Sequence, residues 1–118
     1  MAEEGSAQGQ VGVAISNMVV GELAKTTGRG PTQAKTTFSA NAVFVVLQDT
    51  LTTGERSLVR AGESETVLDL RRRWQSVIRD SCSRGVEQLT GRKVIGFLSD
   101  NQIDPDIAVE VFVLGPTV

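Results

Sequence analysis

The chain has 118 residues, a formal net charge of −2, 40% hydrophobic residues and only 4% aromatic residues. This length fits one domain, and the composition predicts an aliphatic core that needs neither a metal nor a disulfide. The absence of histidine excludes Ser-His-Asp and Cys-His catalysis and His-ligated metal sites. The slightly negative net charge argues against a general nucleic-acid binder.

The sequence carries few signals for export or membrane insertion. Its single cysteine, Cys82, excludes an intrachain disulfide and suits a reducing compartment, and we expect it to be buried. The opening MAEEGSAQGQ lacks the basic start and apolar run of a signal peptide. These features predict a cytoplasmic protein without direct membrane insertion, which would reach a membrane only through a partner. We expect a flexible tail over residues 1–9 and a single domain over residues 10–118.

The first half of that domain reads as a helix followed by a hairpin. Apolar residues at helical spacing predict a helix from about Gln10 to Thr27, which Gly28 would end. Residues 33–39 are polar and β-prone, as expected of an edge strand. Residues 42–48 (AVFVVLQ) are apolar on both faces, which suggests a central strand paired with the first.

The second half reads as two helices followed by two strands. Thr52 and Glu55 have capping-box spacing and predict a short helix that runs to Ala61. A long helix is predicted over residues 64–90, with Gly91 as its stop signal and this apolar stripe: Val67, Leu70, Trp74, Val77, Ile78, Val86 and Leu89.

Two further strands are predicted over residues 93–99 and 106–114, with residues 100–105 (DNQIDP) as a loop between them. The whole pattern predicts an α+β fold in the order α-β-β-α-α-β-β. We expect an antiparallel four-stranded sheet with the helices packed on one face.

The strongest candidate site is the loop that follows the first helix, Gly28, Arg29, Gly30 and Pro31. Its glycines free the backbone to approach a ligand, and Arg29 with Lys35 could attract an anion. The loop lacks the spacing of a phosphate-binding or dinucleotide-binding motif. The simpler interpretation is a helix stop and a tight turn, which by itself explains the glycines.

A second candidate is the basic side of the long helix. Consecutive arginines in the run 71–73 splay about 100° apart, so they do not form one patch. Arg72 and Arg79, seven residues apart, share one side and could contact an acidic partner or RNA. The alternative is a solvated face on which aspartates supply ion-pair partners. No catalytic residues, metal ligands or cofactor site are predicted.

Four stretches in order resemble the MpsC-like domain family: the opening helix running into TGRGPTQAKTTF, then AVFVVLQDTLTTGERSLV, the long helix ending in LTGRKVIGFLSD, and DIAVEVFVL. The match covers about residues 10–114. Its most specific parts are the GRGP loop, the LTxxE element (Leu51, Thr52 and Glu55) and the LTGRKV segment from Leu89 to Val94. The family, long a domain of unknown function, takes its name from a sodium-translocating, membrane-potential-generating system.

The resemblance implies a small protein that works beside a membrane system linked to sodium or inorganic carbon. Our leading hypothesis is therefore a non-enzymatic accessory or regulatory protein that binds an integral-membrane transport subunit. We also expect a homo-oligomer, because the edge strand and the long helix offer symmetric surfaces. One alternative is a small-anion or nucleotide sensor that uses the GRGP loop, and another is an RNA-binding module.

Overall fold

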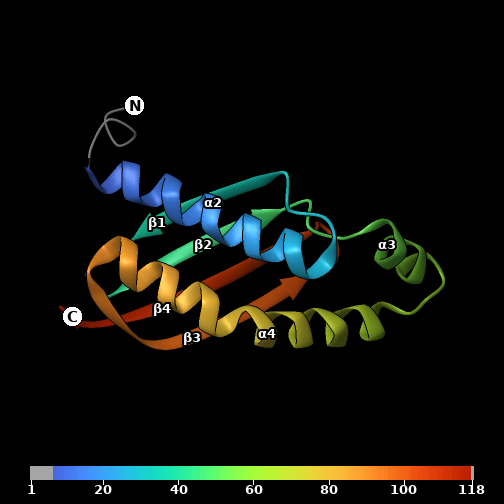
Figure 1. Ribbon diagram of the computed structural model, residues 1–118. Helices are drawn as coiled ribbons and strands as arrows, with labels where there is room; N and C mark the ends of the chain where they lie inside the picture. The colour runs from blue at the N-terminus through green and yellow to red at the C-terminus, as the bar shows by residue number, and fades with distance from the viewer. Residues whose placement is uncertain (1–6, 118) are drawn as a thin grey trace.

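The computed structural model describes residues 7–117. The helices and strands follow the predicted order α-β-β-α-α-β-β, and the fold class is α+β (Figure 1). In chain order they are α2 (Ala7–Thr27), β1 (Gln33–Phe38), β2 (Ala42–Gln48), α3 (Thr53–Arg60), α4 (Ser64–Thr90), β3 (Arg92–Gln102) and β4 (Ile107–Thr117).

Helix α2 begins earlier than predicted. Residues 7–9, expected in a flexible tail, form its first turn, because alanine and glutamine favour a helix. The rest of that predicted tail, residues 1–6, lies outside the described residues. The predicted helix end is confirmed: Gly28 has a φ of 85°, and its N–H donates to the carbonyl oxygen of Ala24 at 2.9 Å.

The sheet consists of two antiparallel hairpins joined at its centre. Strand order is β1-β2-β4-β3, so β1 lies at an edge and β2 is central, as predicted. The join is an antiparallel pairing between β2 and β4, in which Val43 pairs with Phe112 and Gln48 with Ile107. This pairing brings together segments that are far apart in the sequence.

Strand β3 is longer than predicted. The sequence placed residues 100–105 in a loop, but Asp100 to Gln102 continue the strand. Asp100 pairs with Val109, and Gln102 pairs with Ile107. The register with β4 therefore overrides the low strand propensity of aspartate and asparagine.

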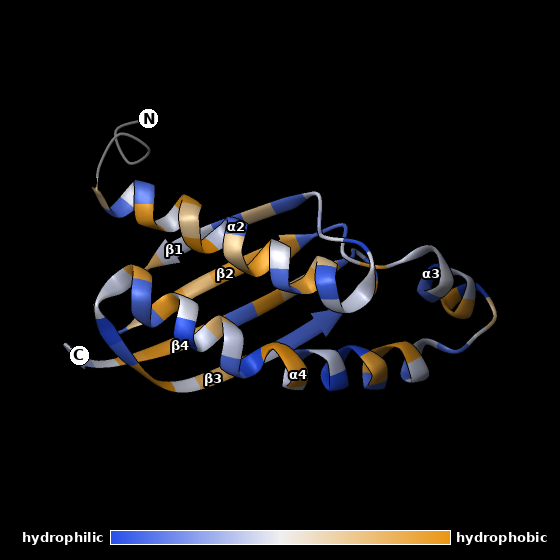
Figure 2. Ribbon diagram, in the orientation of Figure 1, coloured by the Kyte–Doolittle hydropathy of each residue, from blue (hydrophilic) through white to orange (hydrophobic). Residues whose placement is uncertain are grey.

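The helices lie on one side of the sheet, as predicted. Helices α2 and α4 run side by side across it, and α3 lies beyond its end against α4 (Figure 1). Hydrophobic residues concentrate along β2 and on the inner sides of the long helices (Figure 2). The core between these layers is aliphatic apart from one phenylalanine and one cysteine: Ile15, Val19, Leu23, Val43, Val45, Leu47, Ile78, Cys82, Val86, Ala108, Phe112 and Leu114.

The buried side of α4 differs from the predicted apolar stripe. Val77 is 68% exposed, whereas Arg71 and Gln75 are each only 3% exposed. The observed stripe is Val67, Arg71, Gln75, Ile78, Cys82 and Val86. The polar members are buried because Glu55 of α3 and Glu110 of β4 face them and accept their hydrogen bonds.

Both predicted helix signals near α3 and α4 are confirmed. The Thr52 side chain accepts from the Glu55 N–H, and the Glu55 carboxylate accepts from the Thr52 N–H. Gly91 ends α4 with a φ of 69°. Within α4, the absence of a side chain at Gly85 makes room for Met18, whose Cε would lie 2.8 Å from an added Cβ.

Candidate functional site

The GRGP loop is held tightly against α2. Gly28 adopts the left-handed conformation that ends the helix. Gly30 packs closely on α2, because an added Cβ would lie 3.0 Å from Val20 Cγ1 and 3.3 Å from the Val20 carbonyl oxygen. Pro31 is buried. Both glycines therefore have a structural reason to be present.

The guanidinium of Arg29 points into the protein and binds the segment that follows β2. Its Nη1 donates to the carbonyl oxygens of Asp49 at 2.7 Å and Leu51 at 3.2 Å. Its Nη2 donates to Asp49 Oδ2 at 2.7 Å. These three bonds stabilise the end of β2, so the charge that the sensor hypothesis assigned to a ligand has partners within the fold.

Asp49 is the centre of this polar cluster. It is the only non-glycine residue with positive φ, 57°, in the described chain. Oδ2 also accepts from the Thr32 hydroxyl, and Oδ1 accepts from Arg56 Nη2 at 2.6 Å. The hydrogen bonds from Thr32 and Arg29 and the nearby arginine charges lower the pKa of the Asp49 carboxyl.

Asp106 completes the cluster from the start of β4. Its Oδ1 accepts from the Thr50 hydroxyl at 2.8 Å, and its Oδ2 accepts from the Leu51 N–H at 2.9 Å and from Arg56 at 3.3 Å. Sequence analysis did not select Asp49, Arg56 or Asp106. The only signal was indirect: Asp49 follows β2 and Asp106 precedes β4, and those two ends meet once the strands pair.

Replacing Asp106 with alanine should lower the free energy of unfolding by about 2 kcal/mol, because it leaves the partly buried Leu51 N–H and Thr50 hydroxyl without acceptors. Asp106→Asn keeps one acceptor oxygen and should cost less. Urea denaturation measures both changes. Asp104→Ala, at an exposed position in the same turn, is the control and should change stability by less than about 0.5 kcal/mol. Equal effects of Asp106→Ala and Asp104→Ala would contradict a structural role for Asp106.

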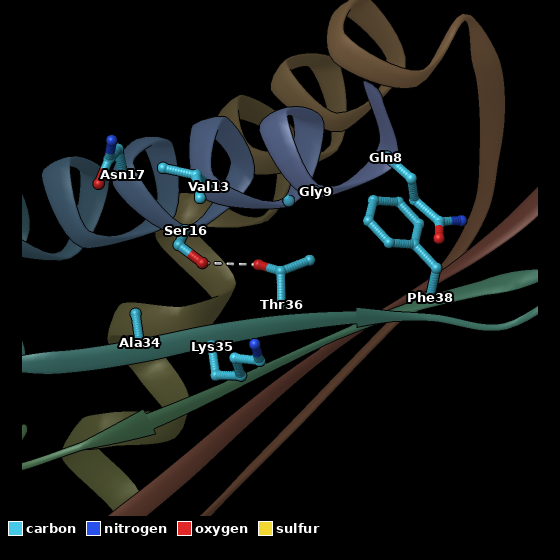
Figure 3. Close-up of a pocket in the computed structure, with 10 residues that line it drawn as sticks. Gln8, Gly9, Val13, Ser16, Asn17, Ala34, Lys35, Thr36 and Phe38 are labelled. Carbon is cyan, nitrogen blue, oxygen red and sulfur yellow. Dashed lines mark hydrogen bonds between the residues drawn. The ribbon is translucent and has the colours of Figure 1, made fainter. Parts of the chain in front are cut away.

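Lys35 does not join Arg29. Its register partner on β2 is Val46, and it lies on the face of β1 away from α2. On the inner face, Thr36 and Ser16 share a hydrogen bond of 2.7 Å, which links β1 to α2 within a groove of about 200 Å³ that both elements line (Figure 3). Because β1 is an edge strand, Lys35 borders this groove.

The two candidate arginines of α4 remain apart. Both side chains are exposed and lie two turns apart, about 10 Å along the helix axis. The guanidinium of Arg79 lies over the Phe97 ring, 5.9 Å from its centroid. Within the described residues Arg72 makes no ion pair. Asp69 pairs with the neighbouring Arg73 at 3.1 Å.

A buried acid lies beneath α4. Glu110 is 0% exposed, and its Oε2 accepts from Gln75 Nε2 at 3.0 Å. Asn101 and Gln75 exchange hydrogen bonds alongside it. Burial raises the pKa of Glu110 to about 7 and, with the Glu110 charge, raises the pKa of the buried Cys82 thiol to about 12. Cys82 is therefore a protonated core residue, as predicted.

The opposite side of the sheet presents apolar residues that no described helix covers. Leu98 and Ile95 are each 62% exposed, Val46 is 40% exposed and Phe44 is 37% exposed. Ile95 belongs to this side because its Cγ2 occupies the space beside Gly115, 2.9 Å from where a Cβ would be. We name this surface the open sheet face, and its apolar residues are Phe44, Val46, Ile95, Leu98, Val109, Val111 and Val113.

The open sheet face also includes part of residues 42–48. Their apolar character on both faces predicted a central strand, and β2 is central. Val43, Val45 and Leu47 face the core, whereas Phe44 and Val46 face outward. Monomeric proteins rarely expose a large contiguous apolar patch, so such a face marks a site of interaction. It is the strongest candidate functional surface of the molecule.

Within residues 7–117, none of the helices has both the length and the apolar run that crossing a membrane requires. No solved structure matches the chain. It is similar to an uncharacterized protein of Bacillus subtilis (strain 168), YrhF, with 33% identity over 90 residues, which covers 73% of this chain and 72% of the relative.

The family comparison agrees with the resemblance seen in the sequence. The family model described as "Na+-translocating membrane potential-generating system (MpsC)" matches residues 7–115. That span includes the GRGP loop, the Asp49 cluster, the strands β1 to β3 and all but the last two residues of β4. The chain therefore belongs to the MpsC family.

Proposed function

We propose that this protein is a non-enzymatic accessory component of a membrane transport system, and that it acts by binding other protein chains through the open sheet face. The observation that carries the proposal is the exposure of Leu98, Ile95, Val46 and Phe44 on one continuous face. Contact with another protein would remove this apolar area from water. Burial of apolar surface stabilises a complex by about 25 cal/mol per Å².

The arrangement of the polar residues supports a binding role over a catalytic one. Arg29, Asp49, Arg56 and Asp106 bind one another or the backbone around the end of β2. These contacts give the four side chains a role in stabilising the fold. The apolar face has no comparable structural explanation within one chain.

Family membership supports the proposed link to a membrane transport system. The MpsC family is named after a Na⁺-translocating membrane-potential-generating system. We place the protein in the cytoplasm, held at the membrane by an integral subunit of a system linked to sodium or inorganic carbon. The buried, unpaired Cys82 suits a reducing compartment.

The test is a pull-down of the tagged full-length protein from detergent-solubilised native membranes, read by mass spectrometry. Wild type should recover an integral-membrane transport subunit that untagged protein displaces. Leu98→Lys, on the open sheet face, should lose it, whereas Val77→Lys, at a similarly exposed apolar position on α4, should retain it. Failure of wild type to recover any membrane transport subunit would refute the proposal.

A further inference from the structure

Strand register arranges the open sheet face in rows that cross all four strands. One row contains Lys35, Val46, Val109 and Asp100, in the spatial order β1-β2-β4-β3. The next row contains Thr37, Phe44, Val111 and Leu98 in the same order. A third row lies on the other side of the row that contains Lys35 and Asp100. It consists of Gln33, Gln48, Ile107 and Gln102. On the central strands β2 and β4 the face is apolar apart from Gln48. In these rows β1 contributes only polar or charged residues, whereas β3 contributes Asp100, Gln102 and the apolar Leu98.

Lys35 and Asp100 are the two charged residues of these three rows, and they stand at opposite ends of the same row. Three strand spacings separate them, which is about 14 Å. This distance prevents them from pairing within one chain. In the described part of the chain neither residue forms an ion pair. The face therefore ends in an unpaired cation on β1 and an unpaired anion on β3.

We propose that the open sheet face binds the same face of a second copy of this chain, around a two-fold axis that runs parallel to the strands between β2 and β4. The rotation places β1 of one copy over β3 of the other. Lys35 of each copy then faces Asp100 of the other, which gives two equivalent ion pairs. The inference rests on the proposed function in using this face as an interaction surface. The second copy then covers the face, so the dimer is the form that binds the membrane subunit, and Leu98→Lys loses that subunit by separating the two copies.

The dimensions of packed sheets permit these contacts. Two sheets packed face to face lie about 10 Å apart, a gap that an extended lysine and an aspartate span from opposite sides. The same rotation places Val46 over Val109 and Phe44 over Val111. The result is an aligned β-sandwich with an apolar centre and a rim that is polar apart from Leu98, and a polar rim around an apolar centre is common in protein interfaces.

The charges also select this axis over the other symmetric choice. A two-fold axis along the charged row, perpendicular to the strands, would place Lys35 over Lys35 and Asp100 over Asp100. Like charges at close range oppose binding. Only the axis parallel to the strands satisfies both charges, and a contact between identical faces is the usual form of a two-fold dimer.

Sedimentation equilibrium of the purified full-length protein tests the proposal, and wild type should show twice the mass of one chain. Asp100→Lys puts lysines at both ends of the row and should weaken the dimer by at least about tenfold. Lys35→Asp should do the same. The double variant Lys35→Asp/Asp100→Lys should recover wild-type affinity, because the swapped charges again face each other. Arg72→Glu, a charge reversal on α4, should have no effect.

The outcomes separate this inference from the proposed function. A monomeric wild type whose capture of a membrane subunit is abolished by Leu98→Lys would overturn the dimer and show that the subunit itself occupies the face. A dimer that the double variant restores, but that recovers no membrane subunit, would support the dimer and refute the accessory role. A dimer insensitive to Asp100→Lys would overturn the proposed axis.

Discussion

Replacing Arg71 with methionine is expected to lower the free energy of unfolding by about 3 to 5 kcal/mol. Arg71 is 3% exposed, and its Nη1 donates to Glu55 Oε1 and to the Thr50 carbonyl oxygen. Its guanidinium also lies over Trp74, 5.7 Å from the ring centroid. Methionine fills much of the space but leaves the Glu55 carboxylate buried without its cation, and Glu55 Oε2 already has no hydrogen-bond partner.

A set of variants isolates the buried charge as the cause. The double variant Arg71→Met/Glu55→Gln should be more stable than Arg71→Met alone, because no ionised group remains buried. The neighbouring Arg72 is exposed, so Arg72→Met should change stability by less than about 0.5 kcal/mol. Urea denaturation monitored by Trp74 fluorescence and by circular dichroism measures all three. An Arg71→Met protein as stable as wild type would show that the pair contributes nothing net.

Local signals in the sequence were sufficient to predict the elements of this fold. The bounds of α4 follow from apolar periodicity and from Gly91, whose left-handed backbone ends the helix. The start of α3 follows from the capping box that Thr52 and Glu55 form. Such features depend on residues within one or two turns, so they are visible without knowledge of the tertiary structure.

Features that depend on distant partners were not predictable. The predicted stripe of α4 contained only apolar residues, and the polar Arg71 and Gln75 are buried because Glu55 and Glu110 face them. Asp49 meets the region of Asp106 only through the register of β2 with β4. The apolar character of β2 on both faces predicted a central strand, but it could not indicate whether α2 and α4 would cover the side chains of Val43 and Val45 or those of Phe44 and Val46.

The same limit applies to the candidate sites. The GRGP loop was selected for glycines and a cation, and the structure gives Gly28, Gly30 and Arg29 local structural roles. The open sheet face carries no motif, because alternating valines occur in any half-buried strand. Two features distinguish it, and both require the folded structure: the exposure of apolar residues such as Leu98 and Ile95, and the positions of Lys35 and Asp100 at the two ends of one row.

Glu110→Gln is expected to stabilise the protein relative to wild type at pH 8 far more than at pH 4.5. Glu110 is fully buried on β4, and its Oε1 has no hydrogen-bond partner. Burial raises its pKa from the usual 4.5 to about 7, although hydrogen bonds from Gln75 and Ser99 and the charge of Arg71 act in the opposite direction. The Cys82 thiol nearby stays protonated and adds no charge.

The sign of the effect follows from proton binding. The folded protein keeps the Glu110 proton up to about pH 7, whereas the unfolded chain loses it near pH 4.5. Stability from this group is therefore full below pH 4.5, falls as the pH rises to 7 and is constant above it. Since one pKa unit corresponds to about 1.4 kcal/mol, the relative gain of the variant between pH 4.5 and pH 8 is at most about 3 kcal/mol.

Urea denaturation of both proteins across this pH range measures the difference, and Glu65→Gln, at an exposed position on α4, is the matched control. The control should show a difference from wild type that is nearly independent of pH, because the exposed Glu65 carboxylate is surrounded by water in both the folded and the unfolded chain. If Glu110→Gln behaves like this control, then Glu110 loses its proton at a similar pH in the folded and unfolded chains. Gln75 and Arg71 would in that case stabilise the carboxylate enough to offset the full cost of its burial.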